Sequence, residues 1–398
     1  MKKILIVFTF LTLYINAQDL EILNEEKKSL RSIDKQIIKQ EYEKSKNDWI
    51  SPININSKIN RTHSFNKSSD NLNKSLSLGF TQSIYESGGI EFTIKYANEK
   101  LQADFLNWEY ENNQLLQEVY ETLLQIKKLN TQIKKSDYEL KNKEIELVLK
   151  KIEYKNGKTD IIELNNAIMA RNNQFKNSVN LKNSLKQQKV ILKKYTNLEF
   201  ENIKLLDFSN IKKDDYIKHN LEILYENSMK KVATTSYKKQ KSSYLPQVSL
   251  STNLSYNKSE NYTLNSSDDN NSAAISLNLS MPLYDVNKKA TLEKLRLETL
   301  KKSANISDLK NQIKKDYEKS LLKIETYKSY NKIINKNIKL YEDLIEVNRV
   351  SNEAGMSSQY DLEILENTKK INEYDLMINN IDMQLEYAKL YFKIKAEV

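Results

Sequence analysis

Apolar and polar side chains alternate along four segments of the chain. In the segment 272–285, the apolar side chains of Ile275, Leu277 and Leu279 occupy every second position. Alternation of this kind predicts a β-strand with one apolar and one polar face. Comparable alternation predicts three further strands, at about 50–66, 74–86 and 245–263. The polar segments between the paired strands, "NKSSDNLN" and "LNSSDDNNS", are rich in residues that favour turns and predict loops.

The rest of the chain has the apolar spacing of long α-helices. Aliphatic residues repeat at every seventh position in the segment after residue 89, which is typical of a coiled-coil seam. These residues are Val119, Ile126, Ile133, Leu140 and Leu147, and Leu116 and Leu123 extend the seam. A helix over residues 89–155 would be roughly 100 Å long. A compact domain of this size could not bury such a helix, so we expect it to form one wall of a tall assembly.

The two halves of the chain repeat one order of elements. Three pairs of landmarks lie about 200 residues apart: Pro52 and Pro246, Tyr85 and Tyr284, and Gly157 and Gly355. The pattern predicts a tandem duplication, with repeats at 18–198 and 212–398 and a connector at 199–211. Each repeat begins with a helix, at about 19–47 or 212–242, and continues with two strands. A helical hairpin with a glycine turn completes it, at about 89–196 or 286–396. With only 5 Gly and 3 Pro in 398 residues, long uninterrupted elements are expected throughout.

The N-terminal segment "MKKILIVFTFLTLYINAQ" has the features of a secretory signal peptide. Two lysines precede an apolar run, and the small residue Ala17 follows it. The run is shorter than the ~20 residues that a membrane-spanning helix needs, which argues against a membrane anchor. We therefore expect residues 1–17 to be removed on export. The chain has no cysteine, so its stability must come from packing or oligomerisation rather than from disulfides.

The charge and the reactive residues exclude several classes of function. The net charge is +10, but lysines alternate with glutamates along the helices, which indicates a solvated surface rather than a nucleic-acid site. The two histidines, His63 and His219, lie far apart, and no phosphate-binding loop, nucleophile motif or metal-ligand spacing occurs. We therefore expect neither enzymatic activity nor a cofactor or metal site.

Four strands need further strands to be stable in a membrane. All four have the length and alternation of transmembrane strands, and aromatic residues near their ends suit membrane interfaces. The smallest single-chain barrels have eight strands, so closure requires several copies of this chain. Three copies give twelve strands and a lumen wide enough for a conduit, whereas two copies give eight strands and a filled lumen. A soluble sheet that caps a helical rod is the alternative.

The order of elements resembles the TolC family of outer-membrane efflux proteins, and the resemblance covers nearly all of the mature chain. The segments "YKNGKTDIIELNNAIMARNN" and "SNEAGMSSQYDLEILENTKK" look like the two periplasmic hairpin tips of that family. The segments "LPQVSLSTNLSY" and "LNLSMPLYD" look like its second-half strands. The resemblance implies a mainly α-helical fold with membrane β-strands: a homotrimer with a twelve-stranded β-barrel in the outer membrane, continuous with a periplasmic α-helical coiled-coil barrel. It also implies a periplasmic adaptor (membrane fusion) protein and an inner-membrane pump or ABC transporter as partners.

The resemblance assigns roles to residues at the two tips. Adaptor docking is expected at Gly157, Lys158 and Thr159 and at Gly355, Met356 and Ser357. Acidic residues beyond the tip glycines narrow the closed entrance in the family, and the matching positions here are Glu163 and Asp361. A second family acid falls on Ile364, and Glu363 and Glu366 lie close to it, so the constriction combines Asp361 with either glutamate or is wider. Carboxylates gathered around an axis would attract cations.

Two functions are compatible with the sequence. The first is a trimeric outer-membrane channel that serves as the exit duct of an efflux pump or type I secretion system and opens by untwisting of its periplasmic helices. The second is a periplasmic coiled-coil adaptor or structural protein without a membrane barrel. The duplicated strand pair favours the channel, because adaptors carry a single helical hairpin beside a glycine-rich β-module, which the sequence lacks.

Overall fold

The computed structural model describes residues 19–66 and 69–395, so the predicted signal peptide lies outside the described residues. The chain is mainly helical with one small antiparallel sheet, as the sequence predicted. It divides into two compact units, each built from both halves of the sequence. The first unit contains residues 108–223 and 309–398 with the N-terminal segment, and the second contains residues 33–107 and 224–308.

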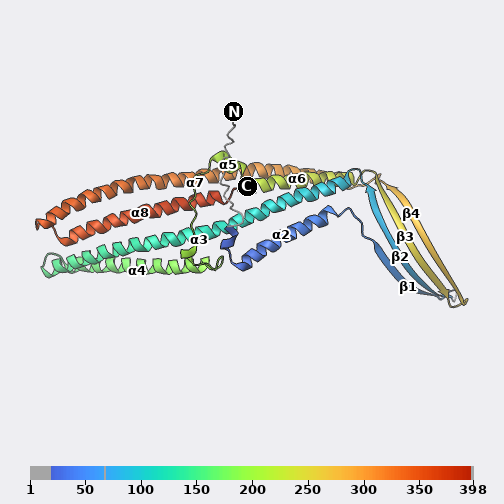
Figure 1. The fold of residues 1–398 in the computed structure, drawn as a ribbon, viewed down its shortest axis with the longest axis horizontal. Helices are drawn as coiled ribbons and strands as arrows, with labels where there is room; N and C mark the ends of the chain where they lie inside the picture. The colour runs from blue at the N-terminus through green and yellow to red at the C-terminus, as the bar shows by residue number, and fades with distance from the viewer. Residues whose placement is uncertain (1–18, 67–68, 396–398) are drawn as a thin grey trace, which may run out of the picture. The chain divides into compact units, whose positions relative to one another are not determined.

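The second unit holds the sheet (Figure 1). Its four strands are β1 (Asn54–Ser64), β2 (Ser69–Tyr85), β3 (Gln247–Asn261) and β4 (Ser266–Ser280). They lie in sequence order and pair antiparallel throughout, so the two hairpins of the two halves join between β2 and β3. Helical parts of this unit come from α2 (Glu25–Lys46), α3 (Gly89–Lys155), α6 (Leu221–Ser242) and α7 (Lys288–Glu353).

The two polar segments predicted as loops belong largely to strands. β2 begins at Ser69 and β4 at Ser266, where each pairs with the end of the preceding strand, Ser64 with Ser69 and Asn261 with Ser266. The prediction failed because serine and asparagine favour turns but also suit the polar face of a strand. β4 ends at Ser280 rather than at 285, because Pro282 follows and has no N–H group for the ladder.

The first unit consists of two helical hairpins and short connecting helices. The tip-forming part of α3 pairs with α4 (Ile161–Leu192), and that of α7 pairs with α8 (Gln359–Tyr391). In Figure 1 the four helices follow the order α4, α3, α8 and α7 across this unit. Its core joins the α3 residues Leu116, Val119 and Leu123 to the α8 residues Leu385 and Ala388.

The predicted seam along α3 is only partly buried. Leu116, Val119, Leu123 and Ile126 are at most 3% exposed. Further toward the tip, Ile133, Leu140 and Leu147 are only half-buried. The buried positions there are Ser136, Asn142 and Ile145, so the contact surface of α3 becomes mixed and largely polar.

The helix predicted at 212–242 is interrupted. It forms α5 (Lys213–Lys218) and α6, with His219 and Asn220 between them. The backbone at the break pairs with the C-terminal segment instead of continuing the helix. Leu221 N–H donates to Lys393 O at 3.0 Å, and Lys395 N–H donates to His219 O at 2.8 Å. This break could not be predicted from the sequence, because it depends on a contact with residues far along the chain.

Candidate functional site

One face of the sheet is apolar over most of its length. Residues that pair in register lie on the same face, and one such row contains Ile55, Leu78 and Leu254. The most exposed members belong to the outer strands: Ile55 is 73% exposed, Ile275 is 78% exposed and Leu279 is 75% exposed. A contiguous exposed apolar face of this kind marks a surface that another molecule or a membrane covers.

At the end of the sheet that carries the two hairpin turns, charged side chains replace the apolar ones on this face. Lys74 and Lys258 lie directly opposite each other across β2 and β3. Glu260 binds both ammonium groups, at 3.4 Å from Lys74 and 2.9 Å from Lys258. The apolar part of β3 therefore runs from Val248 to Tyr256, about 26 Å along the strand at 3.3 Å per residue. The apolar bands of outer-membrane strands are about 25 Å tall.

The opposite face of the sheet carries almost only serine, threonine and asparagine. On β3, for example, the alternate positions from Ser249 to Asn261 are all serine or asparagine. Across the four strands the exceptions on this face are Lys58, Gly79, Asp268 and Ala274. These side chains hydrogen-bond across strands, as between Thr81 and Ser251 at 3.0 Å. One apolar and one hydrated face is the pattern of a strand between lipid and water.

Both edges of the sheet are open in the described part of the chain. β1 pairs only with β2, and β4 pairs only with β3. Each edge strand is long, 11 residues in β1 and 15 in β4, and nearly all of its side chains are exposed. Edges of this length are templates for pairing with another strand.

The hairpin tips of the first unit are built around the two predicted glycines. Gly157 has φ +70° and Gly355 has φ +73°, and a Cβ atom at either position would meet no atom within 4 Å. The glycines thus serve the left-handed turn and not close packing. Lys158 and Met356 beside them are exposed, with Met356 at 84%, whereas Thr159 and Ser357 are half-buried.

We expect Gly355→Ala to lower the free energy of unfolding by about 1 kcal/mol, because alanine adopts positive φ only with strain. Gly355→Asn should cost less, since asparagine tolerates this conformation. Urea titration of the purified variants would measure both changes. Equal stability of the alanine variant and the original protein would contradict the proposed need for glycine.

The predicted acids Glu163 and Asp361 occupy equivalent positions in the first turns of α4 and α8. Asp160 caps α4 by accepting a hydrogen bond from Glu163 N–H at 2.9 Å. Ser358 caps α8 by accepting one from Asp361 N–H at 3.2 Å. The Asp361 carboxylate in turn accepts hydrogen bonds from Ser358 N–H at 3.1 Å and from its hydroxyl at 2.7 Å. Asp361 therefore stabilises the first turn of α8 whether or not it also lines an entrance.

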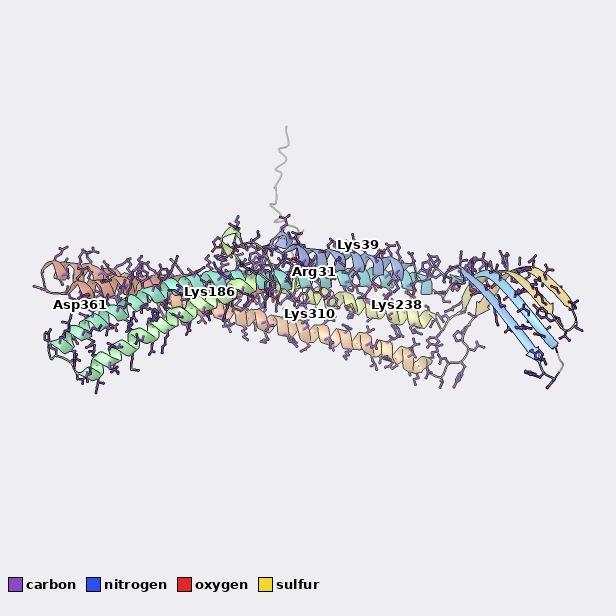
Figure 2. All side chains as sticks on the ribbon, turned by 90° about the horizontal axis from the view of Figure 1, so that it is seen from below. Arg31, Lys39, Lys186, Lys238, Lys310 and Asp361 are labelled. Carbon is purple, nitrogen blue, oxygen red and sulfur yellow. The ribbon has the colours of Figure 1, made fainter. Side chains whose placement is uncertain are left out.

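The remaining predicted acids lie on the surface of α8. Glu363 and Glu366 are both exposed, and Glu366 lies 3.9 Å from Arg349 of α7. Figure 2 shows Asp361 near the end of its hairpin. Within one copy of the chain, Glu163 belongs to one hairpin and the other three acids to the second.

A series of polar contacts joins α3 to α8 in the half of the first unit that is nearer the hairpin tips. Lys128 binds Asp382 at 2.6 Å, and Lys135 binds Asp375 at 2.7 Å. One further heptad along α3, Asn142 donates a hydrogen bond to Thr368 at 3.2 Å and accepts one from Asn367 at 2.9 Å. We call these contacts the α3–α8 ladder.

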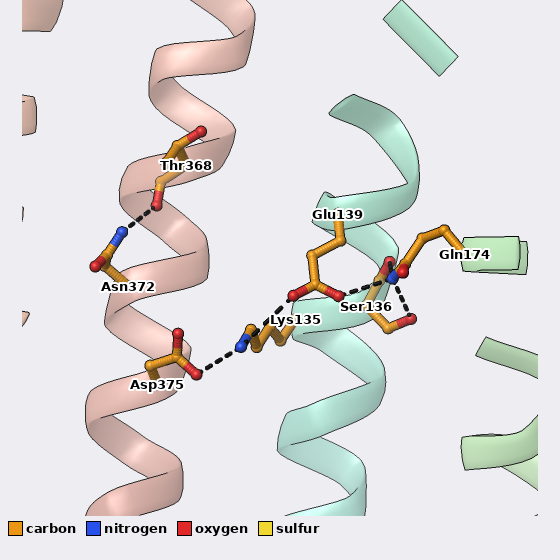
Figure 3. A network of polar contacts seen from close by, with 7 residues as sticks. All are labelled: Lys135, Ser136, Glu139, Gln174, Thr368, Asn372 and Asp375. Carbon is orange, nitrogen blue, oxygen red and sulfur yellow. Dashed lines mark hydrogen bonds and ion pairs between the residues drawn. The ribbon is translucent and has the colours of Figure 1, made fainter. Parts of the chain in front are cut away.

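The ladder extends to a third helix through Glu139 of α3 (Figure 3). Lys135 lies 3.5 Å from Glu139, and the Gln174 amide of α4 donates to the same carboxylate at 2.7 Å and to the Ser136 hydroxyl at 3.1 Å. Polar groups therefore connect three helices in this region. The ladder was not predicted from the sequence, although Lys128, Lys135 and Asn142 are spaced seven residues apart.

A double-mutant cycle would measure the coupling energy between Lys135 and Asp375 of the ladder. Asp375→Leu alone leaves Lys135 with only its contact to Glu139, and we expect a loss of about 1 kcal/mol of unfolding free energy. The double replacement Lys135→Met with Asp375→Leu should recover much of it, because no uncompensated charge remains. The coupling should shrink in 1 M salt, where the Debye length is about 3 Å. Additive effects at low salt would show that the contact carries no energy.

Within the second hairpin, Glu386 of α8 is the most buried ionised group. Its side chain is 7% exposed and lies 3.1 Å from Lys323 and 2.8 Å from Lys389. Burial alone would raise the pKa of Glu386, but the two lysines together outweigh it and hold the pKa below its usual value. The carboxylate thus stabilises the native state at neutral pH.

We expect Glu386→Gln to lower the unfolding free energy by about 1.5 kcal/mol at pH 7, because two charge-assisted hydrogen bonds weaken. A carboxyl group with a lowered native pKa contributes stability above its unfolded pKa and loses it as the pH falls through the native pKa. The difference in stability between the two proteins should therefore shrink as the pH falls below 4.5. Denaturant titrations at pH 7 and pH 3 would test this; a difference at pH 3 as large as the difference at pH 7 would contradict it.

No metal-binding group of three or more His, Cys, Asp or Glu side chains occurs among residues 19–66 and 69–395. Among the helices described here, none combines the length and the apolar character that crossing a membrane requires.

Comparisons with known proteins agree with these features. Residues 45–198 match the sequence profile of a family described as outer membrane efflux protein. No curated protein matches the chain in sequence.

Solved structures share the fold at low sequence identity. The outer membrane protein VceC of Vibrio cholerae has a TM-score of 0.75 at 11% identity, with 96% of each chain covered. The open-state outer membrane channel MtrE of Neisseria gonorrhoeae has a TM-score of 0.73 at 12% identity, covering 94% of this chain and 86% of that one. The Campylobacter jejuni outer membrane channel CmeC has a TM-score of 0.71 at 13% identity, covering 94% and 83%. The resemblance predicted from the sequence, to the TolC family of outer-membrane efflux proteins, is therefore confirmed.

Proposed function

We propose that this protein is a trimeric outer-membrane channel that serves as the exit duct of an efflux pump or type I secretion system. The observation that carries the proposal is the four-stranded sheet, with its apolar face, its serine- and asparagine-rich face and its two open edges. Pairing β4 of one copy with β1 of the next would satisfy both edges. Three copies would give twelve strands around a hydrated lumen, with the apolar faces against lipid.

The helical hairpins would form the periplasmic part of the duct. An adaptor protein bound to an inner-membrane pump or ABC transporter would dock at the tips, around Gly157 to Thr159 and Gly355 to Ser357. Asp361, with Glu163, Glu363 or Glu366, would narrow the closed entrance. Untwisting of the hairpins would open it, and the polar α3–α8 ladder supports this step, because ion pairs and amide contacts exchange with water at less cost than an apolar core.

The experiment that tests the proposal is reconstitution of the purified mature protein into planar lipid bilayers. A channel should give discrete, uniform conductance steps whose frequency rises with the protein concentration. A protein that stays soluble without detergent and gives no steps would contradict the proposal and favour a periplasmic adaptor or structural protein.

A further inference from the structure

Among the residues that the structure describes, the order of helices in the first unit leaves one face of α4 and one face of α7 without a partner. α3 contacts α4 on one side and α8 on the other, and α8 contacts α7. α4 and α7 are therefore the outer members of the row (Figure 1). Each carries a stripe of exposed apolar side chains. The α4 stripe is Ile162, Ile168, Met169, Phe175, Val179 and Val190; the α7 stripe is Tyr330, Ile333, Leu340, Leu344, Val347 and Val350.

Three contacts fix the relative height of the two stripes. Arg171 of α4 binds Glu144 of α3 at 3.2 Å, and Asn142, two residues along, binds Thr368 of α8 at 3.2 Å. The next residue, Lys369, binds Glu342 of α7 at 2.8 Å. Because neighbouring helices run antiparallel, these contacts place Arg171 level with Ile345 to within about one helical turn. Met169 is then level with Val347, and Phe175 with Leu340.

The α7 stripe, about 30 Å long, lies entirely within the height range of the α4 stripe, which is about 42 Å long. Met169 is 54% exposed and Val347 is 65% exposed, and the other members are exposed to a similar degree. If a large apolar side chain has about 150–200 Å² of surface, each stripe offers roughly 500–600 Å². The two together would bury about 1,100 Å², which exceeds the ~1,000 Å² expected of a specific interface. A ring of copies would contain one such seam between each pair of neighbours.

We infer that the α4 stripe of one copy packs against the α7 stripe of the next, with Met169 beside Val347 and Phe175 beside Leu340. This inference rests on the proposed trimer and adds which surfaces join. Rotation about an axis parallel to the helices keeps residues of equal height level in neighbouring copies, so the whole α7 stripe can meet the α4 stripe of the next copy. The contact between copies is then apolar, while the α3–α8 ladder within a copy is polar.

The lysines beside the stripes make the stability of the α4–α7 contact between copies depend on salt. Lys176 of α4 is level with Lys339 of α7, and Lys182 lies between the levels of Lys332 and Lys336. Their mutual repulsion weakens as salt screens it. The seam between copies should therefore strengthen with ionic strength, whereas the Lys–Asp pairs of the α3–α8 ladder should weaken.

Disulfide cross-linking tests the inference directly, because the natural chain has no cysteine. The double variant Met169→Cys with Val347→Cys would be oxidised in membranes with copper phenanthroline and dioxygen, which accept the two electrons and two protons of each thiol pair. We expect covalent dimers and trimers on non-reducing gels that revert with dithiothreitol. Each single variant should remain monomeric.

A height-mismatched pair is the control. Met169→Cys with Ile333→Cys uses the same two stripes, but Ile333 lies about 21 Å along α7 from Val347. It should give few or no covalent oligomers. If the protein has the mass of a trimer but the matched pair does not cross-link, or both pairs cross-link equally, the inference is wrong and the proposed channel stands. A monomeric mass would instead reject the proposed trimer itself.

Discussion

Leu277→Arg should prevent stable insertion of the protein into membranes. Leu277 is 69% exposed at the middle of the apolar part of β4. If this face meets lipid, the guanidinium group enters hydrocarbon, which costs about 2–4 kcal/mol in transmembrane barrels. A ring of three copies carries that cost three times. We expect most of the variant protein to be lost from the outer-membrane fraction, or to unfold in vesicles at a much lower urea concentration.

Ser276→Arg is the matched control for this experiment. Ser276 is the adjacent residue of β4 and lies on the serine- and asparagine-rich face. An arginine there would project into the hydrated lumen, so insertion and stability should change little. Quantitative immunoblots of membrane fractions would compare the two variants. Equal behaviour of both would show that the two faces of the sheet do not separate lipid from water.

Leu123→Ala should destabilise the first unit by about 3 kcal/mol. The Leu123 side chain is 0% exposed and belongs to the core between α3 and α8. Truncation removes buried methyl groups and leaves a cavity that long, tightly paired helices cannot close. This core joins the two hairpins away from the tips, and the polar ladder joins them nearer the tips. Chemical denaturation monitored by circular dichroism would measure the loss.

Lys127→Ala is the control for this experiment. It also replaces a side chain of α3 by alanine, but Lys127 lies on the exposed surface of the helix. Such substitutions usually change stability by less than about 0.5 kcal/mol. A loss for Leu123→Ala that is no larger than this would contradict the proposed core position.

The strands and their two faces could be predicted because each depends on a local pattern. Alternation along β4 identifies Leu277 as apolar-facing and Ser276 as polar-facing without any knowledge of the partner strand. The start of β4 at Ser266 could not be predicted in the same way. Serine and asparagine have similar preferences in a turn and on a hydrated strand, and the pairing with β3 decides between them.

The tip glycines were predictable for a related reason. A glycine that interrupts an otherwise continuous helical pattern predicts a left-handed turn, and Gly157 and Gly355 both adopt positive φ. Glu163 and Asp361 both lie in the first turn of the helix that follows each tip, but the capping box that Asp361 forms with Ser358 was not predicted. Whether these acids also line an entrance depends on how copies assemble and stays a prediction.

The α3–α8 ladder shows what a single sequence does not reveal. Lys135 and Asp375 are separated by 240 positions, and only the register between two distant helices brings them to 2.7 Å. Periodicity identified the heptad repeat along α3, but it selected the half-buried Ile133 and Leu140 rather than the neighbouring polar positions. The apolar residues that periodicity leaves unassigned on α4 and α7 are those that we expect a second copy to cover.

The mass of the mature protein in detergent tests the central claim most directly. Light scattering coupled to size-exclusion chromatography, corrected for bound detergent, separates the protein mass from the micelle. A trimeric channel predicts a single species with three times the mass of the mature chain. A monodisperse monomer that stays soluble after detergent removal would contradict the shared barrel and with it the proposed function.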